Sequence, residues 1–211
     1  EDNGTFSAVI SKFTASFTVT ATAVPKNNRV TFELENLNRD AGANNVNTDE
    51  PYTAKISAQN GYSIPSTITI TNGTEPLVAG EDYTYNAETG DISINANIIN
   101  DNVTIEANGV ANKYKVTFDL NDGVSGNGST NVTSVTVGGT PLTITNGNIE
   151  LYVTYNTTYA TLYVLGESGY TSISFDEFVS AISRLGYTFG GFYEEELAVN
   201  ASTEGIVPVT A

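Results

Sequence analysis

The chain has 211 residues, with 8 Lys and Arg against 24 Asp and Glu, a formal net charge of −16 at pH 7. This excess of carboxylates argues against nucleic acid as a partner, because cations drive binding to phosphate, and it also opposes docking on anionic lipid. No stretch reaches the roughly 18 consecutive apolar residues of a membrane span, and the length allows one large domain or two of about 100 residues.

The sequence contains no Cys, Met, His or Trp. Common zinc sites, His-activated nucleophiles, haem and iron-sulfur ligation are therefore closed to it. Carboxylate pairs remain, so a glycosidase stays open as a third hypothesis, although the acids are scattered over strand faces and turns rather than gathered for a cleft. We expect no enzyme activity, no cofactor and no metal site.

Residues 1–25 form the first predicted unit, an N-terminal strand or linker. The stretch "KFTASFTVTATAVP" alternates apolar and polar residues, which is typical of a strand, and no hairpin partner lies next to it. Two interpretations stay open: it is the first strand of the following module, or a donor strand that completes the sheet of a neighbouring chain.

Residues 26–110 continue the period of two. In "RVTFELENL", Val30, Phe32 and Leu34 fall on one face and polar residues on the other, as in a half-buried strand of an antiparallel sheet. The same pattern recurs in "YTAKISA", "TITIT", "DISINA" and "VTIEA". Turn signals at Asn72-Gly73 and Thr89-Gly90-Asp91 separate these strands.

A Gly/Asn linker, Asn108–Lys113, separates this unit from residues 111–211. The second unit opens with the strand "YKVTFDL" and has turn signals at Gly138-Gly139 and Asn146-Gly147. The segment "PLTITNGNIELYV" predicts a hairpin with Leu142 and Ile144 before its turn and Ile149, Leu151 and Val153 after it.

One segment has helical periodicity. In "SFDEFVSAISRLG", Phe175, Phe178, Val179, Ile182 and Leu185 recur at helical spacing, Ser174 and Glu177 form an S-x-x-E capping box, and Gly186 suits the position after a helix end. We expect a helix over about 175–185.

The second unit contains three motifs in this order along the chain: "VTFDLNDG" (Val116–Gly123), "VTYNTTYATL" (Val153–Leu162) and "RLGYTFGGFY" (Arg184–Tyr193). The unit resembles the Listeria-Bacteroides repeat, the B-repeat of internalin-type bacterial surface proteins. Phe192 stands where the family has Trp, two insertions separate the motifs, and a closing strand is missing before Ala211. The resemblance implies a β-grasp-like module on a bacterial envelope and no enzyme activity.

The first unit is similar to Ig-like β modules of bacterial surface and phage-borne proteins. The similarity rests on the GY-x-x-P stretch at Gly61–Pro65, a DYTY turn region from Asp82 and the closing "VTIEA" strand. Together the resemblances imply a mainly β chain, an Ig-like antiparallel β-sandwich followed by the β-grasp-like module with its single helix.

The glycine-rich stretch "RLGYTFGGFYEEE" lacks the Lys and the strand-to-helix setting of a phosphate loop. We interpret Gly186 as a helix cap, Gly190-Gly191 as a bulge or close crossing, and Tyr187, Phe189 and Phe192 as residues that pack on the sheet.

Other motifs also have a structural and a functional interpretation. Asp119, Asn121, Asp122 and Gly123 resemble part of a calcium loop but lack its remaining ligands. An intramolecular Lys-Asn isopeptide bond needs a buried lysine, and Lys55, which lies mid-strand, is the best candidate, but the sequence has no recognisable motif for this bond. The seven N-x-S/T sequons are expected by chance in a chain so rich in Asn and Thr, and they are Asn3, Asn72, Asn102, Asn127, Asn131, Asn156 and Asn200.

A set of tyrosines favours cross-strand packing over a sugar-stacking platform, namely Tyr83, Tyr85, Tyr152, Tyr155, Tyr159, Tyr163 and Tyr170.

The leading hypothesis is a non-catalytic, extracellular module of a bacterial surface or secreted protein, acting as a spacer or as an adhesion module that binds a host or bacterial surface protein or glycan. The alternative is a structural subunit of a filament, surface layer or phage particle that self-associates by strand addition.

Overall fold

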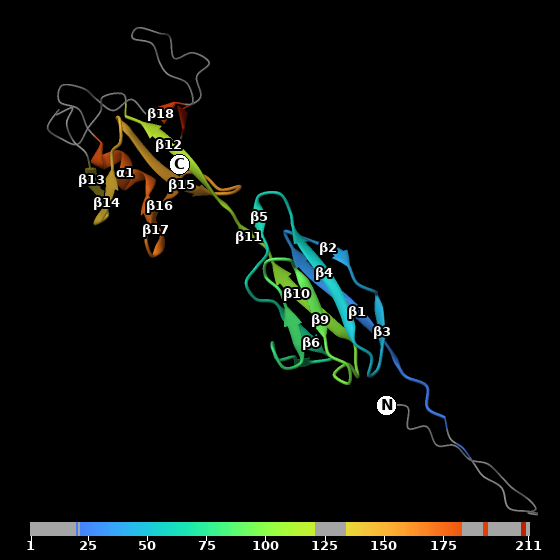
Figure 1. Ribbon diagram of the computed structural model, residues 1–211. Coiled ribbons are helices and arrows are strands. Elements are labelled where there is room, and N and C mark those ends of the chain that lie inside the picture. Colours follow the sequence, from blue (N-terminus) through green and yellow to red (C-terminus); the bar gives the residue numbers. More distant parts are fainter. Residues whose placement is uncertain (1–19, 21, 121–133, 183–191, 194–207, 210–211) are drawn as a thin grey trace, which may run out of the picture.

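The computed structural model describes residues 20, 22–120, 134–182, 192–193 and 208–209. Within these residues the chain is mainly β, with many short strands and one helix, so the predicted mainly β class is confirmed. Figure 1 shows two bodies arranged end to end, the first built from residues before Lys113 and the second from residues after it.

The first body is a β-sandwich of two sheets. One sheet has the strand order β3-β1-β10-β6-β7, and its strands are β1 (Asn27–Glu35), β3 (Asn45–Asn47), β6 (Thr69–Asn72), β7 (Glu75–Pro76) and β10 (Val103–Asn108). The other has the order β2-β4-β9-β8, and its strands are β2 (Leu37–Ala41), β4 (Tyr52–Ala58), β8 (Tyr83–Tyr85) and β9 (Asp91–Ile94). A short ladder of β5 (Tyr62–Ser63) and β11 (Val110–Ala111) closes the end that leads to the second body.

The core of the sandwich follows from the alternation in the sequence. The inward positions of each sheet carry isoleucine, as in Ile56 of β4, Ile94 of β9 and Ile105 of β10, all with no exposed surface. Each buried side chain of this size contributes about 1.5–3 kcal/mol through the hydrophobic effect. The predicted turns at Asn72-Gly73 and Thr89-Gly90 are present, with Gly73 at φ 62° and Gly90 at φ 75°.

One pairing differs from the expected antiparallel arrangement. β1 lies parallel to β10, with Val30 opposite Val103 and Glu35 opposite Asn108. Alternation predicts which face of a strand is buried, but it carries no information on strand direction. The first and last long strands of the sandwich are therefore neighbours that run the same way.

The second body has an antiparallel sheet of order β12-β15-β16-β17 and a separate pair of strands, β13 and β14. The strands are β12 (Lys113–Asp119), β13 (Ser134–Val137), β14 (Thr140–Thr143), β15 (Asn148–Thr154), β16 (Thr161–Gly166) and β17 (Gly169–Ser174), followed by α1 (Phe175–Ala181) and the short pair β18 (Phe192–Tyr193) and β19 (Pro208–Val209). Its core shares no residue with the core of the sandwich.

The hairpin predicted over residues 141–153 forms only at its turn. Asn146 and Gly147 have positive φ, and Thr145 and Asn148 exchange two backbone hydrogen bonds of 2.9 Å. Beyond that bridge the two arms separate, because β14 pairs with β13 whereas β15 pairs with β12 and β16. The turn was predicted correctly, and the pairing of its arms was not.

The helix is shorter than predicted. α1 ends at Ala181, and Ile182 is already extended, with φ −98° and ψ 121°. The expected capping box does not form, since Ser174 makes no side-chain cap hydrogen bond and the Glu177 carboxylate lies near Gly138 instead. The buried apolar residues of α1, Phe175 and Phe178, contact Phe118 of the sheet. Leu185 and Gly186 lie outside the described residues.

Phenylalanine rings hold α1 to the sheet. Phe178 has no exposed surface, lies 4.9 Å from Phe118 between ring centroids, and stacks on Phe192 at 5.7 Å. Phe192 also lies 4.8 Å from Phe118 of β12 between ring centroids, so its predicted packing on the sheet is confirmed. None of the described helices is long and apolar enough to cross a membrane.

Candidate functional site

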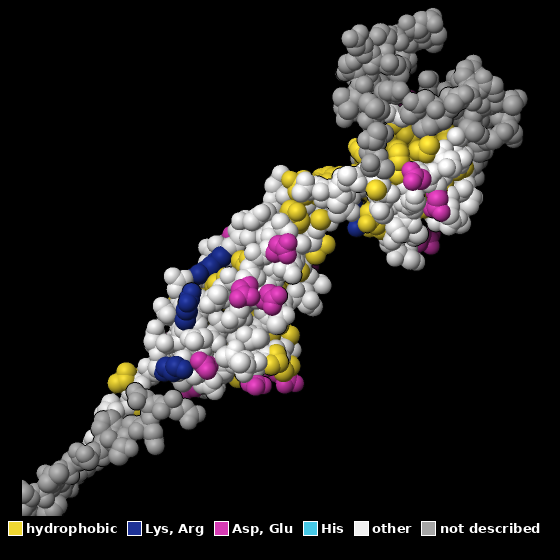
Figure 2. Space-filling model, turned by 180° about the vertical axis from the view of Figure 1, so that it is seen from behind, with side chains coloured by type: hydrophobic (Ala, Val, Ile, Leu, Met, Phe, Trp, Pro, Cys, Tyr) yellow, Lys and Arg dark blue, Asp and Glu magenta, His cyan; other side chains and the backbone are white. Residues whose placement is uncertain are grey.

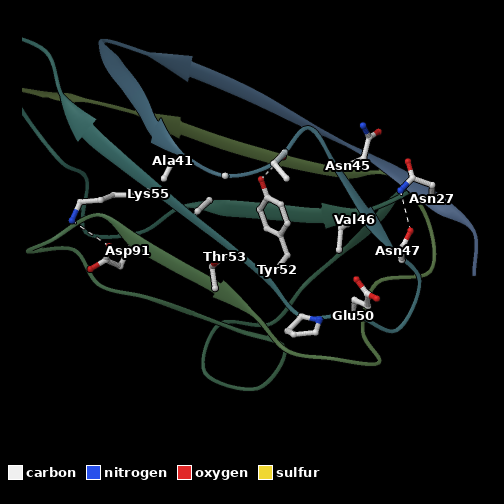
Figure 3. A pocket seen from close by; sticks show the side chains of 14 residues that line it. Asn27, Ala41, Asn45, Val46, Asn47, Glu50, Tyr52, Thr53, Lys55 and Asp91 are labelled. Carbon is white, nitrogen blue, oxygen red and sulfur yellow. Dashed lines mark hydrogen bonds and ion pairs between the residues drawn. The ribbon is translucent and has the colours of Figure 1, made fainter.

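The first candidate site is a groove of about 680 Å³ on the side of the sandwich, shown in Figure 3. It lies where β2 separates from β4, because the register of this pair shifts between Arg39 and Ala41 and the chain then crosses to β3 in the other sheet. The crossing leaves the first residues of β4, Tyr52 and Thr53, without a neighbour on that side among the described strands.

Tyr52 supports the wall of this groove. Its hydroxyl donates a 2.7 Å hydrogen bond to the Ala43 carbonyl, and burial raises the pKa of its phenol. Gly42 faces the same hydroxyl, and a Cβ there would lie 2.6 Å from the Tyr52 oxygen. Tyr52 therefore holds the crossing segment in place and stays protonated at neutral pH, which suits a structural brace and not a catalytic base.

Three charged side chains line the groove, Glu50, Lys55 and Asp91, and two of them contact each other. Lys55 and Asp91 form an ion pair of 3.3 Å, and the Thr89 hydroxyl together with Lys55 lowers the pKa of Asp91. Asp91 is consequently ionised at neutral pH and unsuited to act as a general acid. Among the described residues no three His, Cys, Asp or Glu side chains gather as a metal site would need.

Lys55 does not fit an isopeptide bond. Its side chain is 44% exposed and contacts Asp91, whereas that reaction needs a buried lysine beside an asparagine and an acid. The exposure of Lys55 therefore agrees with the absence of a motif for this bond in the sequence. The residue lies mid-strand as expected, but it points to the solvent face of β4.

The second candidate site is the solvent face of the second body's sheet, which we call the tyrosine face: Lys113, Tyr152, Tyr163 and Tyr170. The Tyr152 and Tyr170 rings meet edge to face at 5.2 Å, and Tyr163 contacts Tyr170 at 6.4 Å. The Lys113 ammonium lies over the rings of Tyr163 and Tyr170, 4.4 Å from the first ring centroid and 5.1 Å from the second. Tyr170 remains 46% exposed, so part of its surface is open to a partner.

The seven tyrosines do not form one platform. Tyr83 and Tyr85 belong to the sandwich, where their hydroxyls donate to the carbonyls of Ile68 and Pro65 at 3.0 and 2.8 Å. Tyr159 contacts Phe118 and the second core. The expectation of cross-strand packing is confirmed for Tyr152 and Tyr163, which are partners in the β15–β16 ladder.

The third feature is the joint between the two bodies. Asn112 donates its backbone N–H to the Gly61 carbonyl at 2.9 Å, and its own carbonyl accepts from the Tyr155 N–H at 2.7 Å. The Ser63 hydroxyl donates to the Asn112 side-chain oxygen. The Tyr155 ring lies over Gly61 and meets the edge of Tyr62 at 5.5 Å.

Sequence reasoning missed this joint. The sequence pattern places Tyr155 among the strand tyrosines and Asn108–Lys113 in a linker, and neither pattern indicates a contact between them. The structure explains why residue 61 is glycine: its φ is 85°, and a Cβ there would collide with the Tyr155 ring. The sequence alone shows the glycine but not the ring that it contacts.

The remaining predicted residues are divided by the described ranges. Asn121, Asp122 and Gly123 of the calcium-like loop, and Gly186, Tyr187, Phe189, Gly190 and Gly191 of the glycine-rich stretch, lie outside them, as do the sequons at Asn3, Asn127, Asn131 and Asn200. Asn72 and Asn102 use their side-chain oxygens to accept backbone hydrogen bonds, whereas Asn156 is exposed.

No family model, no curated protein and no solved structure matches the chain.

Proposed function

We propose that the chain is a non-catalytic, two-module spacer of an extracellular bacterial protein, in which an Ig-like sandwich is followed by a β-grasp-like module. The observation that carries this proposal is the joint at Asn112. The resemblance of the second unit to the Listeria-Bacteroides repeat supports the location at a bacterial surface.

A spacer must transmit a fixed distance, and a flexible linker would not. Here the connection is itself a strand, because β11 pairs with β5 directly before Asn112 bonds to both bodies. The Tyr155 ring fills the space over Gly61, where no side chain would fit. Backbone hydrogen bonds and aromatic packing together favour one relative orientation of the two modules.

The test is a distance measurement between the modules. The chain has no Cys, so spin labels at Glu75→Cys and Glu167→Cys report one distance without other labelled sites. We expect a narrow distance distribution in the parent chain, broadened by Tyr155→Ala because the joint loses its ring. Tyr170→Ala is the matched control, since it removes an exposed tyrosine of the same module away from the joint. A broad distribution in the parent chain would refute a rigid spacer.

The tyrosine face is the surface that we propose for adhesion. Its aromatic rings with Lys113 suit flat partner surfaces and apolar sugar faces alike. Screening the full chain against glycans and surface proteins tests this role. A specific ligand should lose affinity with Tyr170→Ser and keep it with Tyr114→Ser, which alters an exposed tyrosine on the opposite face of the sheet.

A second candidate function is a structural subunit that assembles by strand addition. The described residues of the N-terminal segment, Thr20 and 22–24, lie in no strand, and Val24 is 87% exposed. This favours a segment that is available to another chain over one built into its own sandwich. Deleting Glu1–Val24 tests the idea by light scattering, and association that survives the deletion would contradict it.

A further inference from the structure

The outer edge of β1 is partly open. β3 covers β1 only from Asn27 to Arg29, and the Val30 N–H bonds to the Asn44 carbonyl at 2.7 Å. The Glu35 carbonyl accepts from Gly109 on the β10 side, so odd-numbered residues of β1 point their backbone groups at β10 and even-numbered ones point away. The backbone groups of Phe32 and Leu34 thus face outward, and among the described strands none pairs with β1 on that outer side beyond Arg29.

A groove lies beside this edge. It measures about 430 Å³ and is lined by β1 from Arg29 to Phe32 together with Arg39 and Asn44. The Arg39 guanidinium lies 4.4 Å over the Phe32 ring and donates to the Asn44 side-chain oxygen at 2.7 Å. An open edge next to a hollow is the arrangement that strand addition uses, since backbone bonds give affinity and the hollow receives a side chain.

Charge limits which segment can lie there. The solvent face of the edge carries the exposed acids Glu33 and Glu35, which disfavour a strand that places acids of its own beside them. In Figure 2 the dark-blue Lys and Arg side chains of the sandwich follow one side, and Asp and Glu are spread over the face beside it. A strand that joins this edge should therefore carry no acid of its own.

The N-terminal segment meets this requirement, and its described residues lie in no strand of their own. Between Asp2 and Glu33 the sequence has no Asp or Glu, and residues 13–24 alternate, with Phe13 and Phe17 on the apolar face and Thr and Ser on the other. Lys12 precedes the segment and complements the acids of the edge. The segment enters the sandwich at the start of β1, and its described end, Val24, is exposed.

We propose that residues 13–24 of a second copy add as a strand to the open edge of β1, pairing with Phe32 and Leu34 and placing a phenylalanine in the groove beside Arg39. This inference rests on the second candidate function and names its acceptor site. The donor's threonine face then lies level with Glu33, and its apolar face turns toward the sandwich. The acceptor edge is complete only when another copy supplies the strand.

Cysteine crosslinking of full-length chains tests the position. Donor variants with one cysteine each, Thr14→Cys, Thr18→Cys and Thr22→Cys, are mixed with the acceptor variant Glu33→Cys under mild oxidation. The matched control acceptor is Glu106→Cys, because Glu106 is paired with Glu33 across the β1–β10 ladder and lies one strand further from the donor. A disulfide needs Cα atoms within about 7 Å, so at least one donor should give about tenfold more crosslinked dimer with Glu33→Cys than with the control.

A second measurement follows association by sedimentation velocity. Phe17→Ala should abolish association at concentrations where Phe17→Leu retains it, because only the alanine leaves the groove without a large apolar side chain. Association that depends on residues 1–24 without crosslinks at Glu33 would overturn this acceptor site and leave the second candidate function intact. A full-length chain that is monomeric at every concentration would overturn both.

Discussion

Asn72 is the residue that fixes the loop between β9 and β10. Its side-chain nitrogen donates to the Ile98 carbonyl at 3.1 Å and to Asn100 at 2.8 Å, while its oxygen accepts from the Asp101 N–H at 2.9 Å. We expect Asn72→Ala to lower the free energy of unfolding by about 2–3 kcal/mol, since each lost bond contributes about 0.5–1.5 kcal/mol. Urea unfolding measures the loss. The control Asn108→Ala, at an exposed position, should change stability by less than about 0.5 kcal/mol.

Gly90 and Gly147 give a matched pair for the cost of a side chain in a turn. Their φ angles are 75° and 78°, but a Cβ on Gly90 would collide with the Ile56 carbonyl, whereas nothing lies within 4 Å of one on Gly147. Gly147→Ala should cost about 1–2 kcal/mol, the ordinary penalty of the left-handed region. Gly90→Ala should cost clearly more, because the backbone of β4 must also move. If thermal unfolding shows the same loss of stability for both variants, the backbone of β4 moves away from the new Cβ at little energetic cost, which would contradict this prediction.

At the scale of elements, α1 depends on the sheet. A helix of seven residues is too short to be stable alone in water, and it is anchored by Phe175 and Phe178. We expect Phe178→Ala to destabilise the second body by about 3–5 kcal/mol and to reduce the helical signal in circular dichroism. Val179→Ala, on a half-buried residue of the same helix, is the control and should cost less. Loss of helix in both variants to the same extent would contradict an anchor at Phe178.

The strands show what alternation in a sequence does and does not determine. Buried faces were predicted for β1, β4, β9, β10 and β12, because each strand carries its apolar residues at every second position. Their neighbours were not, since the parallel β1–β10 pair joins residues more than seventy positions apart. Periodicity is a local property, whereas strand order depends on how the whole chain closes.

The candidate sites were predicted less well than the strands, for a related reason. The tyrosine face gathers Lys113, Tyr152 and Tyr170 from three strands, and the groove beside Tyr52 exists because β2 leaves its partner after Arg39. Neither arrangement leaves a spacing in the sequence. Composition limits the available chemistry without any knowledge of contacts, because the sequence has neither His nor Cys.

At the scale of the whole molecule, the two cores should unfold as two units. The first cluster spans residues 30–107 and the second, in its buried residues, spans 118–182, and they share no side chain. Among the described residues, the hydrogen bonds and ring contacts between the bodies lie in the joint around Asn112 and Tyr155, which is small compared with either core. Such an arrangement favours separate cooperative transitions that the joint couples weakly.

A pair of core substitutions tests this division, which also corresponds to the predicted boundary at Asn108–Lys113. Ile105→Ala in β10 and Leu162→Ala in β16 each remove a side chain with no exposed surface. Each should cost about 2–5 kcal/mol, because it deletes buried methyl groups and leaves a cavity. In hydrogen exchange, Ile105→Ala should weaken protection across the sandwich and leave β15 and β16 nearly unchanged, and Leu162→Ala should do the reverse. If either substitution weakens both bodies equally, the joint couples them into one cooperative unit, and the boundary would mark a change of core without marking a change of folding unit.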